Sequence, residues 1–131
     1  MAMAVLVVDD SPVMRKFICR VIRLAGFEDA EFFEASDGRE ALAQLEKRSV
    51  DVILTDINMP CMNGEALMQA LQENGTLLRT PALVISTDAT RDRIHRMLEL
   101  GAKGYISKPF CPEALRAELD RILGEQHACR N

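Results

Sequence analysis

Acidic side chains come directly after two aliphatic runs of this sequence. Asp9 and Asp10 follow residues 4–8 (AVLVV), and Asp56 follows residues 52–55 (VILT). Aliphatic runs of this length are typical of buried strands. A carboxylate at the end of a buried strand is costly to remove from water unless a nearby group cancels its charge. The placement therefore predicts that a cation lies opposite Asp56.

Three carboxylates would converge if the two runs are neighbouring parallel strands. Two unit charges about 4 Å apart repel by roughly 4 kcal/mol at an effective dielectric constant of about 20. Hard carboxylate oxygens suit Mg²⁺, which binds a few carboxylates together with waters. Lys108 follows a weaker apolar run at 104–107, and its stem can span the roughly 10 Å of two strand spacings. The pattern predicts a magnesium site with a fixed lysine beside it.

The elements that must position these side chains alternate along the chain. Strands are predicted at 4–8, near 30–35, and at 52–55, 82–86 and 104–107. Helical periodicity predicts helices at 12–25, 38–48, 64–73, 91–100 and 112–123. Ser11 and Pro12 suit a helix start, and Gly26 suits a stop. Such alternation predicts an α/β fold with a five-stranded parallel sheet covered on both faces, and ligands bind such sheets beyond the carboxyl ends of the strands.

Composition excludes several classes of protein. The 131 residues and 48% hydrophobic content favour one domain with its own core. With 16 basic and 20 acidic residues the net charge is −4, which argues against a general nucleic-acid binder. No run reaches the roughly 18 apolar residues of a membrane span, and the start MAMAVLVV lacks the basic region of a signal peptide. The segment after Leu123, GEQHACRN, is expected to fray.

Cysteine spacing argues against a zinc site or a disulfide framework. Four cysteines lie far apart and form no C-x-x-C pair: Cys19, Cys61, Cys111 and Cys129. Reduced thiols are typical of the cytosol, so the sequence favours a cytoplasmic protein.

Each polar segment has an ordinary structural explanation when it is taken alone. An Asp-Asp pair after a strand is often a helix cap or a solvated turn, and Asp56 is a possible turn former. Ser86 is a possible strand-end hydroxyl, and Lys108-Pro109 a simple loop. What favours a functional site is that each of these segments lies just past the end of a different predicted strand.

Four segments resemble the receiver domain of two-component response regulators: VLVVDDS, VILTDINMPCMNG, ALVIST and AKGYISKPF. The resemblance covers residues 3–124 and is close to the stand-alone, CheY-like chemotaxis type. It implies a flavodoxin-like (βα)₅ fold with strand order 2-1-3-4-5. It also implies a receiver domain at 3–124, a short tail at 125–131 and a monomer.

The resemblance implies a role for each site residue. Asp56 is similar to the phosphoacceptor of the family, and Lys108 to the lysine that pairs with the phosphoryl oxygens. Asp10 would bind Mg²⁺ directly, Asp9 would act through a metal-bound water, and the backbone carbonyl of Asn58 would be a further ligand beside Asp56 itself. An aspartyl phosphate forms when a positioned metal and lysine neutralise the charge of the transferring group.

The resemblance also implies a switch. Ser86 would be its hydroxyl and Tyr105 its aromatic residue, with Ser86 drawn towards the new phosphoryl oxygens and Tyr105 turning from exposed to buried. The Lys108-Pro109 bond is a candidate cis peptide. Thr87 departs from the family, in which Ala or Gly usually follows the switch hydroxyl.

The expected partners are proteins. A histidine kinase or phosphotransfer protein, or a small phosphodonor, would supply the phosphoryl group. A downstream protein would bind the face formed by the expected helix at 91–100, strand at 104–107 and helix at 112–123. The basic residues of this face suggest an acidic partner segment: Arg91, Arg93, Arg96 and Lys103. The basic side of the first helix, with Arg15, Lys16, Arg20 and Arg23, would meet the kinase. Such a protein catalyses only its own phosphorylation and dephosphorylation.

Three alternatives stay open at this point. A haloacid-dehalogenase-like phosphatase also uses an aspartyl phosphate and Mg²⁺, but it requires D-x-D where this chain has Asp9-Asp10-Ser11. A flavodoxin-like cofactor binder should have a first loop rich in Ser, Thr and Gly, and DDSPVM would repel a phosphate without a metal. The third is a receiver fold that no longer phosphorylates. The sequence does not distinguish motor binding, a relay shuttle and a phosphate sink.

Overall fold

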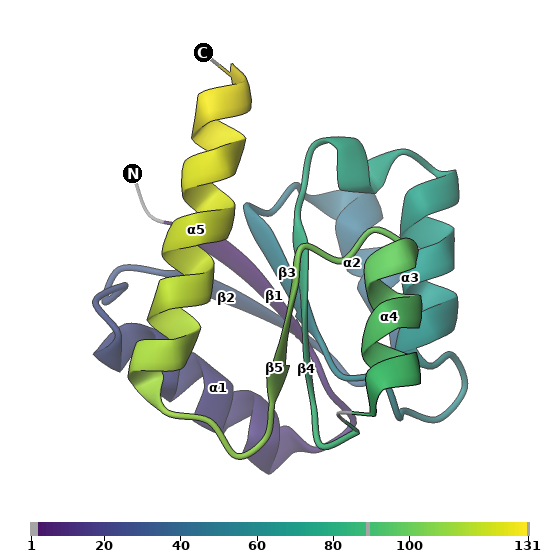
Figure 1. Cartoon of the computed structure of the whole chain (residues 1–131), viewed down its shortest axis with the longest axis horizontal. Helices are drawn as coiled ribbons and strands as arrows, with labels where there is room; N and C mark the ends of the chain where they lie inside the picture. Colours follow the sequence, from purple (N-terminus) through teal and green to yellow (C-terminus); the bar gives the residue numbers. More distant parts are fainter. Residues whose placement is uncertain (1–2, 89, 131) are drawn as a thin grey trace.

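The structure is a computed structural model that describes residues 3–88 and 90–130, with 125–130 as backbone only. Strands and helices alternate along the chain (Figure 1). Their bounds are β1 Ala4–Val8, α1 Pro12–Leu24, β2 Glu31–Ala35, α2 Gly38–Lys47, β3 Val52–Thr55, α3 Gly64–Glu73, a 3₁₀ turn η1 Thr76–Leu78, β4 Ala82–Ser86, α4 Arg91–Glu99, β5 Gly104–Ser107 and α5 Pro112–Arg130.

All five strands are parallel and lie in the order β2-β1-β3-β4-β5, which confirms the predicted fold class. The register pairs Val8 of β1 with Thr55 of β3. The residues that follow these two strands, Asp9 and Asp56, therefore leave the same edge of the sheet at the same level. The amide of Asp56 donates to the carbonyl of Val8 at 2.9 Å, which continues the ladder to the acidic residues.

Two hydrophobic cores lie on opposite faces of the sheet. Helices α1 and α5 cover one face, and α2, α3 and α4 cover the other (Figure 1). Neighbouring residues of β1 divide between the cores, because Val5 and Val7 face α1 and α5 whereas Leu6 and Val8 face the other layer. Burial on both faces explains why β1, β3 and β4 are almost uniformly apolar. A sheet held this firmly gives the loops at its edge a rigid base.

Local signals at α1 agree with the structure. The Ser11 hydroxyl accepts from the Met14 amide at 3.2 Å, and Pro12 occupies the first turn. Gly26 has a φ of 112°, a conformation that glycine adopts without strain, and the helix ends just before it. These caps fix where the Asp9-Asp10 loop ends and the helix begins.

The largest differences from the expected element bounds are at two places, and the other ends agree to within a residue. The last helix, expected to end at residue 123 and to be followed by a frayed tail, runs to Arg130. The turn η1 at Thr76–Leu78 was not predicted. Among the described residues, no helix is both long enough and apolar enough to cross a membrane.

Candidate functional site

The acidic residues converge at the carboxyl edge of the sheet. Carboxylate oxygens of Asp9, Asp10 and Asp56 lie within 4.8 Å of one another. Asp9 is 2% exposed, whereas Asp10 is exposed and Asp56 lies between these extremes. The structure thus brings together the three carboxylates that the strand pattern predicted would meet. Such a group of oxygens suits a hard divalent cation.

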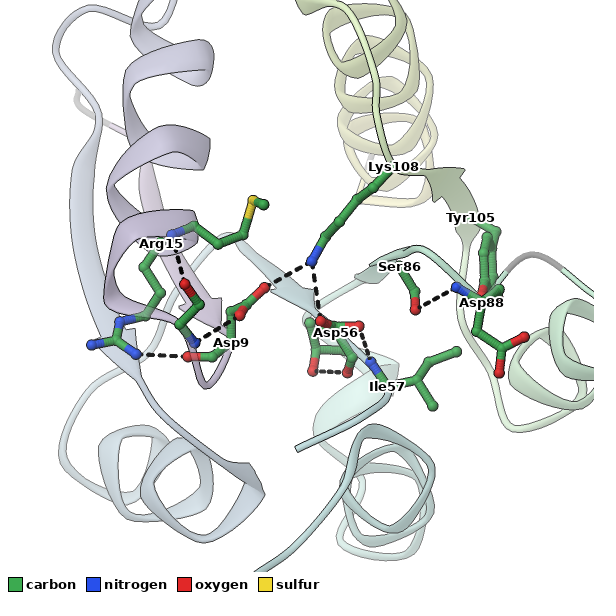
Figure 2. A network of polar contacts seen from close by, with 11 residues as sticks. Asp9, Arg15, Asp56, Ile57, Ser86, Asp88, Tyr105 and Lys108 are labelled. Carbon is green, nitrogen blue, oxygen red and sulfur yellow. Dashed lines mark hydrogen bonds and ion pairs between the residues drawn. The ribbon is translucent and has the colours of Figure 1, made fainter. Parts of the chain in front are cut away.

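Lys108 bridges two of these carboxylates. Its Nζ lies 2.9 Å from Asp9 Oδ2 and 3.0 Å from Asp56 Oδ2, and the lysine side chain is 9% exposed (Figure 2). Burial alone would lower the pKa of Lys108, but its hydrogen bonds to Asp9 and Asp56 hold that pKa above the ordinary value. The predicted cis bond between Lys108 and Pro109 is present. The ammonium is the cation expected opposite Asp56.

Hydrogen bonds distinguish Asp9 from Asp10. Asp9 Oδ1 accepts from the Ser11 amide at 2.9 Å, while Oδ2 accepts from Lys108. Asp10 is exposed and forms no hydrogen bond or ion pair with the described part of the chain. Asp56 accepts from the Ile57 amide at 2.6 Å through Oδ1. Asp10 is therefore the carboxylate best placed to bind a metal directly.

The start of α3 packs against the backbone of Asp56. Asn63 caps this helix, and its Oδ1 accepts from the Ala66 amide at 2.9 Å. The Gly64 amide donates to the Ile57 carbonyl at 2.7 Å. A Cβ at position 64 would lie 2.2 Å from the carbonyl oxygen of Asp56 and 2.7 Å from Ile57 Cα. Only glycine allows this approach. Asn58, the other expected ligand residue, is exposed in the same loop.

Ser86 and Tyr105 both contact Asp88 (Figure 2). Ser86 is buried, and its Oγ accepts from the Asp88 amide at 3.1 Å. The Tyr105 hydroxyl donates to the Asp88 carbonyl, and its ring packs half-buried against the core under α4. Burial raises the pKa of Tyr105. The exposed resting position expected for Tyr105 is not the one seen here, and its switching role stays a prediction.

Sequence reasoning missed the support behind Asp9. Arg15 Nη1 donates to the Asp9 carbonyl at 2.6 Å, and Arg15 Nε pairs with Glu34 at 2.9 Å. Lys16 also binds Glu34, at 2.6 Å. The sequence alone assigns both basic residues only to a docking surface. No spacing in the sequence links position 34 to position 15, but the pairing of Val7 with Glu34 places this acid beside the end of β1.

The fold and the acidic site together define a class of protein. Residues 5–120 match the family model for the response regulator receiver domain, and the chain belongs to this family. Members are signalling proteins of two-component systems rather than enzymes that turn over a separate substrate. Membership of this family excludes the phosphatase and flavodoxin-like alternatives.

Several proteins of similar sequence are chemotaxis proteins. The chain is 38% identical to CheY-3 of Vibrio cholerae over 121 residues, which are 92% of each chain. It is 36% identical to CheY of Pseudomonas aeruginosa over 92% of this chain and 96% of the relative. The crystal structure of Vibrio cholerae CheY4 has a TM-score of 0.82 and 36% identity, and the match covers 93% of this chain and 99% of that one. The chain is thus a CheY-like response regulator with an acidic site formed by Asp9, Asp10 and Asp56.

Proposed function

We propose that Asp56 accepts a phosphoryl group in the presence of Mg²⁺, and that the phosphorylated chain binds a protein partner through α4, β5 and α5. The observation that carries this proposal is the Lys108 ammonium between Asp9 and Asp56, at 2.9 and 3.0 Å, beside a third carboxylate. A carboxylate that only formed a turn would not need two charged neighbours and a nearly buried lysine.

The donor set fits a magnesium ion. Asp10 would bind it directly, Asp56 and the Asn58 carbonyl would complete the protein ligands, and Asp9 would act through a metal-bound water. Asp9 suits the indirect role, because Ser11 and Lys108 already occupy its oxygens. When bound, Mg²⁺ neutralises charge on the transferring phosphoryl group.

The residues of the chain perform the transfer. The Ile57 amide fixes Oδ1 of Asp56. A new bond forms between an Asp56 carboxylate oxygen and phosphorus, while the P–N bond of a phosphohistidine, or the P–O bond of acetyl phosphate, breaks. Lys108 then pairs with a phosphoryl oxygen in place of the carboxylate oxygen. Attack by water later restores the free carboxylate, so the signal cancels itself.

The surface beside the site supports docking of a histidine kinase or phosphotransfer protein. On α1, Val13 is 79% exposed and Phe17 is 47% exposed. Phe17 packs edge-on against Phe110 of the β5–α5 loop, with ring centroids 6.0 Å apart. An exposed apolar patch of this kind, flanked by the basic residues of α1, is typical of a protein contact. Partners of this kind, together with the free cysteines Cys19, Cys61 and Cys111, support a cytoplasmic location.

Labelling with acetyl phosphate tests the proposal. The unmodified chain should incorporate phosphate when Mg²⁺ is present and lose the reaction when EDTA is added, as measured by intact-protein mass. Asp56→Asn should abolish incorporation. Asp29→Asn makes the same chemical change at an exposed residue away from the site and should leave it unchanged. Full labelling of the Asp56→Asn variant would overturn the assignment.

A further inference from the structure

Every polar group of Asp88 has a partner. Its amide donates to Ser86 Oγ at 3.1 Å, and its carbonyl accepts from the Tyr105 hydroxyl (Figure 2). Oδ1 accepts from Thr90 Oγ1 at 3.1 Å, and Oδ2 pairs with Arg93 Nε at 3.3 Å. One residue therefore touches both expected switch residues and the first turns of α4.

Arg93 extends this network to a second helix. Its Nη1 lies 3.0 Å from Glu65 Oε1 on α3, so one guanidinium joins two carboxylates from different segments. The side chains of Arg93 and Glu65 are 35% and 33% exposed. Burial raises the pKa of Asp88, but hydrogen bonds from Thr90 and Arg93 outweigh it and hold the pKa below the ordinary value. Asp88 is thus charged at neutral pH.

We propose that Arg93 is a positioning residue of the phosphoryl switch. It holds Asp88 against α3. Asp88 in turn keeps the Ser86 hydroxyl oriented for the phosphoryl group on Asp56 and keeps the Tyr105 ring half-buried. The inference rests on the proposed function of Asp56. A serine hydroxyl has one proton and two lone pairs. The Asp88 amide donates to Ser86 Oγ, so this contact does not use the Ser86 proton. That proton can be donated to the Tyr105 hydroxyl, with which Ser86 interacts here, or to a phosphoryl oxygen on Asp56 once one is present. Asp88 also contacts Tyr105 through its carbonyl, so the positions of Ser86 and Tyr105 both depend on where Arg93 holds Asp88.

A bound ligand shifts a conformational equilibrium only through contacts that differ between the states. If Arg93 stabilises the half-buried position of Tyr105, its loss lowers the population of the arrangement that receives the phosphoryl group. Partly exposed ion pairs typically contribute about 0.2–1 kcal/mol, so we expect a change of about threefold in affinity. The change should become smaller in about 1 M salt, where the screening length is about 3 Å.

The chain carries a built-in probe, because it has one tyrosine and no tryptophan. We would label Tyr105 with 3-fluorotyrosine and measure its solvent exposure by ¹⁹F NMR. Beryllofluoride with Mg²⁺ would serve as the mimic of the aspartyl phosphate. Arg93→Gln should expose Tyr105 without ligand and weaken beryllofluoride binding about threefold. Arg93→Lys, which keeps the charge, should restore part of both effects.

A double-mutant cycle separates positioning from a merely structural role. In a Glu65→Gln background the effect of Arg93→Gln should shrink, because one of the two contacts is already gone. Arg39→Gln removes the same charge from an exposed position on α2 that forms no ion pair with the described residues, and it should change neither readout.

The outcomes distinguish the two proposals. If the unmodified chain does not respond to beryllofluoride, the proposed function of Asp56 fails, whereas the exposure of Tyr105 without ligand still decides the role of Arg93. If Arg93→Gln matches Arg39→Gln in Tyr105 exposure and in affinity, the positioning role is overturned.

Discussion

Asp9 and Asp10 are adjacent in the sequence, yet their surroundings differ completely. Asp9 is 2% exposed and accepts from Lys108 and the Ser11 amide, whereas Asp10 is exposed and has no such partner among the described residues. The carboxylate of Asp9 is therefore held by the protein, whereas that of Asp10, the next residue, is available to bind a metal. Residue identity alone does not distinguish them; the strand register and the α1 cap do.

The first prediction ranks the metal ligands. Asp10→Asn should weaken Mg²⁺ binding at least about tenfold, because even indirect metal partners contribute this much. Asn58→Ala should weaken it less, because the substitution keeps the backbone carbonyl. Isothermal titration with Mg²⁺ would measure both, and the reverse ranking would contradict the ligand set.

Thr87 and Ser86 are the subject of the second prediction. Ser86 is buried and Thr87 is exposed beside it, at a position where the resemblance leads us to expect Ala or Gly. A misplaced attacking group can cost roughly 100-fold in rate, and the stiff threonine should narrow the path of water to phosphorylated Asp56. Thr87→Ala should therefore speed loss of the phosphoryl group, measured by the decay of labelled protein.

Ser86→Ala provides the comparison. It should leave phosphorylation possible while Tyr105 no longer responds. If Thr87→Ala uncouples Tyr105 and Ser86→Ala does not, then Thr87 is the switch hydroxyl and the assignment is off by one residue.

At the scale of the element, β2 and α1 are joined by one acid. Glu34 on β2 binds Arg15 and Lys16 on α1, and a hydrogen bond from Lys16 is the main cause that lowers the pKa of Glu34. A lowered folded-state pKa adds stability above the unfolded value of about 4.3, and this stability is lost as the pH falls through the folded pKa.

The third prediction follows from the lowered pKa of Glu34 in the folded state. Glu34→Gln should lower the free energy of unfolding by up to about 1 kcal/mol at pH 7. The difference from the unmodified chain should shrink as the pH drops below about 4.3. Urea unfolding at both pH values would measure it. Glu28→Gln, at an exposed residue of the α1–β2 loop, should show no such difference at either pH.

Elements that are formed by local sequence signals could be predicted, whereas contacts between distant segments could not. Strands β1, β3 and β4 have continuous apolar runs, and α1 has a capping serine and a terminal glycine, so local pattern was enough. The convergence of Asp9, Asp56 and Lys108 followed from parallel strand ends.

Contacts between elements could not be predicted in this way. Arg93 pairs with Glu65, which lies 28 positions away in the sequence, and no sequence pattern links the two residues. Cys61 takes a positive φ of 64° in the β3–α3 loop, although cysteine has no preference for it. The 3₁₀ turn at Thr76–Leu78 depends on a short connection packed against α3. These features come from packing that a single segment does not record.

At the scale of the whole molecule, one sheet supports two cores and a site at its carboxyl edge. On the α1 and α5 side, the buried apolar residues of α5 among the described side chains are Leu115, Leu119 and Ile122, and the partly buried Leu123 packs against the same core. The expected domain boundary at residue 124 falls after all three, inside α5.

The fourth prediction tests that boundary. A chain that ends at Gly124 should keep the free energy of unfolding and the beryllofluoride response of the full chain, because all three buried residues remain. Leu119→Ala is the contrasting variant and should cost about 2–5 kcal/mol through the cavity it leaves. Thermal unfolding of the two would measure this, and a large loss on truncation would place residues 125–131 within the domain.

Gly64 has no functional group, yet the structure makes it as restrictive as any residue of the site. A methyl group there would meet the carbonyl of Asp56 at 2.2 Å, so the start of α3 or the end of β3 would have to move. In a library that randomises the loop 61–64 and is selected for phosphorylation, Cys61 can vary, because it is exposed and its φ suits smaller or more polar residues better. Position 64 should return glycine almost every time. A survey of tolerated substitutions would therefore rank Gly64, which has no functional group, as high as Asp56, because no larger residue fits at this position.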